Sequence, residues 1–178
     1  MRPAAALAVV ALAASLAAAP AAHAGEIALP GTRAVLDLPA GWTPIEGATE
    51  RGLVAGYRGA RGMVLAVTRA GVPNTDAYRK AAREAYADQI ERGIAGRVDG
   101  YRRIARRLGE RHGTPALDLE ARRRDGATIV VRVLLFWTYA LALAIEVPPG
   151  EGVAAARAIA AGFGPPAPRP PAASPPKR

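Results

Sequence analysis

The sequence predicts an α+β domain in which an antiparallel sheet is flanked by helices. Three observations predict it: short alternating apolar segments separated by glycine-containing turns, an apolar stripe of period four over residues 78–94, and an Ala-rich helical segment over 153–163. Strands joined by tight turns pair antiparallel, and a helix with one apolar face buries it against another element, here the sheet that these strands form. The 178 residues make one such domain once both ends are set aside.

The N-terminal end has the pattern of a secretory signal peptide. Arg2 precedes an apolar stretch over 4–19, and Ala22, His23 and Ala24 form the A-x-A pattern that signal peptidase cleaves. We therefore expect a signal peptide over 1–24 and a secreted or periplasmic product. An uncleaved anchor is the alternative, but the stretch is short for a spanning helix, which needs about 20 residues. We expect no transmembrane segment after processing.

The composition of the C-terminal end predicts a tail that does not fold. Residues 164–178 contain seven prolines and no large apolar side chain. Such a segment cannot bury enough apolar surface to fold, so we expect it to be extended and disordered. The folded domain is then expected to span residues 25–163.

The first strands are predicted before residue 70. Residues 33–38 alternate as a strand does, and we expect a turn at 39–42 to close it, with Trp42 folding back to cap the core. Residues 53–58 and 63–69 follow as two strands of a hairpin, because the glycines of 59–62 suit a tight loop.

An amphipathic helix is predicted next. Asn74 or Thr75 is placed to cap it, with Asp76 in its first turn, and we expect it to end near Gly93 or Gly96. One face carries an apolar stripe: Tyr78, Ala82, Tyr86, Ile90 and Ile94.

A further strand is predicted over 101–108, followed by a hairpin of residues 116–123 and 127–137. A two-residue loop at 125–126 would pair Leu119 with Arg132 and split the apolar side chains between two faces. A three-residue loop at 124–126, with Gly126 left-handed, pairs Asp118 with Arg132 instead. We prefer the second register because it gathers the apolar set on one face: Leu117, Leu119, Ala121, Ile129, Val131 and Val133.

Residues 139–147 alternate cleanly and predict a strand with its odd-numbered side chains inward and its even-numbered side chains, mainly alanines, outward. A turn at Pro148, Pro149 and Gly150 follows. The last predicted element is the helix over 153–163, ending near Gly162 or Gly164.

The order of these motifs resembles the PsbP-like α/β/α sandwich and, within it, small exported bacterial proteins of the DcrB type. The likeness rests on "LDLPAGW" at 36–42, "GTPALDLEAR" at 113–122, the "DG" turn, "LLFWTYALAL" at 134–143, and "VPPG" with the helix ending in "AAGF". It implies a binding or assembly factor without shared catalytic residues, although fold alone does not fix function. The chain lacks the cysteine through which lipoprotein members are tethered.

An excess of arginine is the main functional signal. The formal charge is +9, or +8 without the signal peptide, and only Lys80 and Lys177 are lysines. We take as a candidate binding surface the arginines of two neighbouring segments: Arg102, Arg103, Arg106, Arg107, Arg122, Arg123 and Arg124. Strand alternation predicts Arg103 and Arg107 on one face and Arg102 and Arg106 on the other.

Guanidinium groups favour anions, so the expected partner is an envelope protein or an anionic polymer or lipid surface. Nucleic acid is disfavoured by export and by sparse aromatic interleaving.

No catalytic or metal signature accompanies these arginines. The chain has no cysteine, and no calcium or phosphate-binding motif, so we predict no catalytic residue, metal or cofactor. The leading hypothesis is a non-enzymatic binding or accessory protein of the cell envelope. The alternative is a small hydrolase or ligand-binding enzyme using His112 with nearby carboxylates, and a purely structural accessory subunit is a third possibility.

Overall fold

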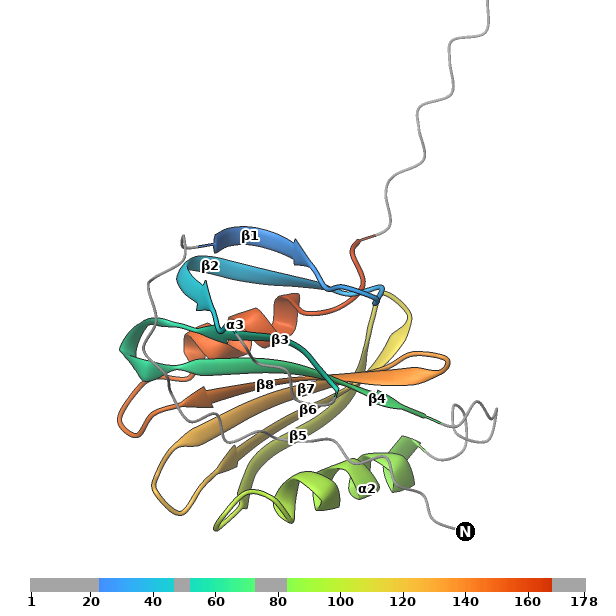
Figure 1. Ribbon diagram of the computed structural model, residues 1–178. Coiled ribbons are helices and arrows are strands. Elements are labelled where there is room, and N and C mark those ends of the chain that lie inside the picture. The colour runs from blue at the N-terminus through green and yellow to red at the C-terminus, as the bar shows by residue number, and fades with distance from the viewer. Residues whose placement is uncertain (1–22, 47–51, 73–82, 168–178) are drawn as a thin grey trace, which may run out of the picture.

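The computed structural model describes residues 23–46, 52–72 and 83–167. In these ranges eight strands form one antiparallel sheet, in the order β1-β2-β3-β4-β8-β7-β6-β5, with two helices on opposite faces (Figure 1). The strands are β1 (His23–Ala28), β2 (Val35–Pro44), β3 (Leu53–Arg58), β4 (Val64–Gly71), β5 (Arg102–Arg111), β6 (Thr114–Arg122), β7 (Thr128–Leu135) and β8 (Tyr139–Val147). The helices are α2 (Arg83–Ala95) and α3 (Ala154–Gly162), and η1 (Ala60–Gly62) is a single 3-10 turn. The predicted fold class is confirmed.

One core lies between α3 and the sheet, on what we call the α3 face. Odd-numbered side chains of β8 and β4 point here, together with even-numbered side chains of β2. Phe163, directly after α3, is fully buried among them. None of the helices in the described ranges is long and apolar enough to cross a membrane.

A second core lies on the opposite, α2 face. The predicted stripe of α2 is buried there through Tyr86, Ile90 and Ile94, against odd-numbered side chains of β6 and β7. Even-numbered alanines of β8, Ala140 and Ala142, are buried in this core too. The prediction of an outward face for 140 and 142 was therefore wrong, because helices cover both faces of β8.

The central hairpin has the register predicted with a three-residue loop. Asp118 is opposite Arg132, and Leu119 is opposite Val131. The backbone N–H of Arg123 donates to the carbonyl of Ala127 at 2.9 Å, and Gly126 has φ +88°. The hairpin between β3 and β4 around η1 also forms as predicted.

The N-terminal strands differ most from the prediction. No turn interrupts β2 at 39–42; the strand continues to Pro44, and β1, which the sequence analysis did not predict, pairs with it. The register shifts between His23 and Gly25, opposite Leu38 to Trp42, so Pro39 lies in an irregular stretch where its missing N–H costs no ladder hydrogen bond. Trp42 is buried, as predicted, and its ring lies against Gly59.

The C-terminal segment begins as part of the fold. Gly164 and Val35 exchange two backbone hydrogen bonds, of 2.8 and 3.1 Å, so residue 164 is held against β2 rather than starting a free tail. Residues 1–22 and 168–178, the predicted cap at Asn74 or Thr75, and the stripe positions Tyr78 and Ala82 lie outside the described residues. The proposed signal peptide and the rest of the tail stay predictions.

The buried phenol of Tyr86 makes the folded state less stable at alkaline pH. Burial raises the pKa of its phenol to about 12 from 10.0. The folded chain therefore keeps this proton at a pH where the unfolded chain has lost it, so stability is intact below pH 10 and falls as pH rises towards 12. We expect Tyr86→Phe to lose less stability than the unsubstituted protein between pH 9 and about pH 11, measured by urea unfolding at both values. Equal losses in the two proteins would contradict this role of Tyr86.

Candidate binding site on the open part of the sheet

The α3 face is only partly covered. Helix α3 lies mainly over β2, β7 and β8, and it reaches β6 through Arg157, while β5 has exposed side chains on this face. Ala105 and Arg107 of β5 are exposed there, in line with a sheet surface that no helix covers. We call the charged side chains around this opening the basic face: Arg102, Arg107, Arg122, Arg132 and Arg157, with Asp118 and Glu120.

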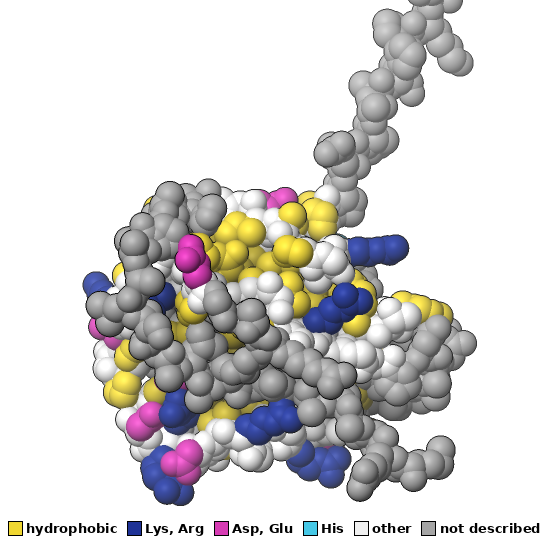
Figure 2. Space-filling view, in the orientation of Figure 1, with side chains coloured by type: hydrophobic (Ala, Val, Ile, Leu, Met, Phe, Trp, Pro, Cys, Tyr) yellow, Lys and Arg dark blue, Asp and Glu magenta, His cyan; other side chains and the backbone are white. Residues whose placement is uncertain are grey.

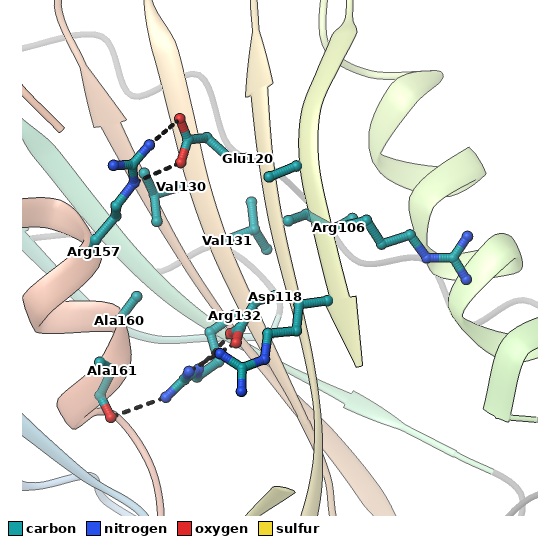
Figure 3. A pocket seen from close by; sticks show the side chains of 12 residues that line it. Arg106, Asp118, Glu120, Val130, Val131, Arg132, Arg157, Ala160 and Ala161 are labelled. Atoms are coloured by element: carbon teal, nitrogen blue, oxygen red, sulfur yellow. Dashed lines mark hydrogen bonds and ion pairs between the residues drawn. The ribbon is translucent and has the colours of Figure 1, made fainter. Parts of the chain in front are cut away.

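A groove of about 370 Å³ runs between α3 and β5 within the basic face. Two guanidinium groups are fixed along it by bidentate ion pairs (Figure 3). Arg132 binds Asp118 at 2.6 and 2.9 Å and also donates to the carbonyl of Ala161 in α3 at 2.9 Å. Arg157 binds Glu120 at 2.8 and 2.9 Å.

These two pairs rigidify the groove because bidentate guanidinium–carboxylate contacts fix orientation as well as distance. Each pair links α3 to the sheet: Arg157 comes from the helix, and Arg132 reaches it through Ala161. The hydrogen bond to Glu120 raises the pKa of Arg157. Glu120 itself is buried, so its charge is matched by a partner, as a buried carboxylate requires.

Three other arginines of the basic face, Arg102, Arg107 and Arg122, form no ion pair with any residue that the structure describes. Arg107 is directly opposite Asp118 across the β5–β6 ladder, but that carboxylate is already held by Arg132. Arg102 is directly opposite Arg122. Like charges at directly opposed strand positions repel, so this pair favours an anion between its guanidinium groups.

The predicted division of the arginines between the two faces was wrong. A bulge shifts the β5–β6 register between Arg103 and Ala105, so Arg103 is opposite Ala121 while Arg106 is opposite Leu119. Both therefore point to the α2 face, whereas Arg102 and Arg107 share the α3 face. The extra residue reverses the alternation on one side of the bulge.

Arg103 and Arg106 serve to attach α2. Arg106 binds Glu84 at 2.9 Å and Asp88 at 2.5 Å, and its side chain extends towards the helix (Figure 3). Arg103 binds Glu91 at 3.0 Å, and that carboxylate also accepts a hydrogen bond from the hydroxyl of Tyr101 at 2.9 Å. Burial, reinforced by this hydrogen bond, raises the pKa of Tyr101.

The arginines at the β6–β7 loop form a third group. Arg123 binds Glu146 at 2.7 Å and Asp125 at 3.1 Å, and Arg124 binds Asp99 at 3.2 Å. The seven candidate arginines therefore do not make one patch, and the basic side chains visible in Figure 2 are likewise dispersed. Arg102, Arg107 and Arg122 are brought together on the α3 face. Arg132 and Arg157, which were not among the predicted site residues, are also part of the site.

His112 lies at the exposed two-residue loop between β5 and β6, where it and Gly113 have φ of +46° and +76°. Within the described ranges it forms no hydrogen bond or ion pair, and Asp118, the carboxylate six residues further along the chain, is bound to Arg132. The same ranges contain no cluster of three His, Cys, Asp or Glu side chains suited to a metal ion.

Comparison with known proteins shows which solved structures share this fold. The solution structure of cyanobacterial PsbP (CyanoP) from Synechocystis sp. PCC 6803 aligns with 88% of this chain and 98% of its own, with a TM-score of 0.56 and 14% identity. The fold is PsbP-like. A crystal structure from Bacteroides thetaiotaomicron VPI-5482 aligns with 79% of the PsbP-like chain and 48% of its own, with a TM-score of 0.52 and 12% identity. No family model and no curated protein matches the sequence.

The resemblance predicted from the sequence motifs is thus confirmed for the PsbP-like fold, while the narrower likeness to DcrB-type proteins stays a prediction. At these identities the comparisons establish the shared fold alone, so the role of the site has to be argued from its own side chains.

Proposed function

We propose that this PsbP-like chain is an exported, non-enzymatic binding or accessory protein of the cell envelope that engages an acidic partner through the basic face. The observation that carries the proposal is the set of three exposed guanidinium groups, Arg102, Arg107 and Arg122, that have no acidic partner among the described residues and share one open surface. Export rests on the signal-peptide pattern of residues 1–24.

The energetics favour a partner with several anionic groups. One exposed ion pair contributes only about 0–1 kcal/mol. Three guanidinium groups on one face of the sheet can add their contributions, and repulsion between Arg102 and Arg122 is relieved when a carboxylate lies between them. Such a contact weakens as salt rises, because the Debye length shortens from about 10 Å at 0.1 M to about 3 Å at 1 M.

The test is crosslinking in the native envelope followed by mass spectrometry, comparing the unsubstituted protein with the double variant Arg102→Glu and Arg122→Glu. We expect a partner whose crosslinks fall at least fivefold in the double variant and in high salt. The control is the double variant Arg92→Glu and Arg97→Glu, two exposed positions away from the basic face that should leave the crosslinks unchanged.

Two results would count against the proposal. Crosslinks that persist in the double variant and in high salt would instead indicate a structural subunit held by apolar contacts. Equal losses in both double variants would show that overall charge, and not the basic face, attracts the partner.

A further inference from the structure

We propose that the groove between α3 and β5, together with the sheet surface beyond it at Arg102 and Arg122, binds an extended acidic segment of a partner polypeptide. One carboxylate of this segment lies on Arg107 in the groove and a second on Arg102 and Arg122. The inference rests on the proposed function and goes further, because it names the class of ligand, its conformation and the spacing of its charges.

The lining of the groove suits side chains of a polypeptide. Its walls carry the two bidentate ion pairs, while Ala105, Val130 and Ala160 provide apolar surface between them. A ligand that fills it needs both short apolar groups and anionic groups. The surface of a bilayer cannot enter such a hollow and would touch only its rim, so an acidic polypeptide fits this site better than a lipid surface does.

Among the arginines that line the groove, Arg107 has a guanidinium group available to bind a ligand carboxylate. Asp118 and Glu120 are each bound by a bidentate arginine, and neither forms an ion pair with Arg107. Arg107 is exposed at the groove and is directly opposite Asp118. A ligand carboxylate there gains a charge-assisted contact to Arg107, while the neighbouring pairs stay intact.

The positions of the arginines set the spacing of the ligand's charges. Arg107 is opposite Asp118, and Arg102 is opposite Arg122, four residues further along β6. At about 3.3 Å per residue the two basic positions lie about 13 Å apart. In an extended ligand, acidic residues at i and i+4 span the same distance and point to the same side.

The chain's own C-terminal segment is a poor occupant. Residues 168–178 include Arg169, Lys177 and Arg178 but no acidic residue. Like charge therefore disfavours this segment at the basic face.

The experiment measures fluorescence anisotropy of labelled peptides on the full chain. The test peptide contains Glu-Thr-Val-Thr-Glu, a spacing control contains Glu-Thr-Val-Glu, and a neutral control has Gln in place of both Glu. We expect the test peptide to bind at least tenfold more tightly than the neutral control. Arg107→Gln should weaken its binding about tenfold, the effect of losing one charge-assisted contact.

Arg92→Gln provides the matched variant, since it removes one arginine from α2, which packs on the opposite face of the sheet. It should leave the peptide affinity within about twofold, as expected of a distant surface charge. Circular dichroism melting curves should show that both variants stay folded. The proposal is overturned if Arg107→Gln and Arg92→Gln have equal effects, or if the spacing control binds as tightly as the test peptide.

Vesicles containing anionic lipid test whether a membrane surface, rather than an acidic polypeptide, is the ligand. We expect them to bind much more weakly than the test peptide at equal negative charge, and the reverse order would overturn a polypeptide ligand. Failure of the peptide while envelope crosslinks still depend on Arg102 and Arg122 would reject the groove ligand alone. Loss of that dependence would reject the proposed function itself.

Discussion

Replacing Phe163 by alanine is expected to lower the free energy of unfolding by about 3–5 kcal/mol. Its ring is fully buried between the end of α3 and the sheet, and its backbone N–H donates to the carbonyl of Ile159 at 3.1 Å. Removing the ring leaves a cavity where α3 and the Val35–Gly164 contact meet. The measurement is urea unfolding followed by circular dichroism.

Two further substitutions serve as controls for the stability loss expected of Phe163→Ala. Phe163→Leu keeps most of the apolar volume and should cost less than the alanine variant. Ile104→Ala removes an apolar side chain that is 48% exposed and should change stability by less than about 0.5 kcal/mol. A loss below about 1 kcal/mol for Phe163→Ala would show that α3 does not depend on this contact.

Replacing Arg106 by glutamine is the second large expected effect, a loss of about 2 kcal/mol in the free energy of unfolding. The Arg106 guanidinium lies within 4 Å of three carboxylates on α2, those of Glu84, Asp88 and Glu91, and its side chain is only 18% exposed. Without it these carboxylates repel one another and α2 loses its main polar link to β5.

The neighbouring residue supplies the matched control. Arg107→Gln removes the same charge one position along β5, but on the other face, where no described residue forms an ion pair with it. We expect it to change stability by less than about 0.5 kcal/mol while it weakens peptide binding. Similar destabilisation by both variants, in urea melts at the same pH, would refute the division of the two arginines between structure and binding.

Much of the sheet could be predicted because its strands carry a two-residue period and its hairpins have glycine at the positions that need it. Asp118 opposite Arg132 followed from gathering the apolar side chains on one face. The burial of Ala140 and Ala142 could not be predicted in this way. Alanine fits an exposed face and a tightly covered one equally well, and only the placement of α2 decides between them.

The candidate site was predictable in part. The abundance of arginine near 102–107 and 122–124 indicated where to look, but periodicity gave the wrong faces because a bulge leaves no sure mark in the sequence. Arg157 lies 37 residues from Glu120 and comes from a helix, so no local pattern joins the two. Identifying the groove required the three-dimensional position of α3.

The bulge in β5 also determines how the strand would respond to the deletion of one residue. Because Arg103 is opposite Ala121 and Ala105 is opposite Glu120, deleting Ile104 would remove the extra residue and leave both pairings in place. Arg103 would stay on the α2 face near Glu91, and Arg102 and Arg107 would stay on the open surface. A single codon lost at this position would therefore regularise the strand, and each arginine would keep its role in attachment or in binding.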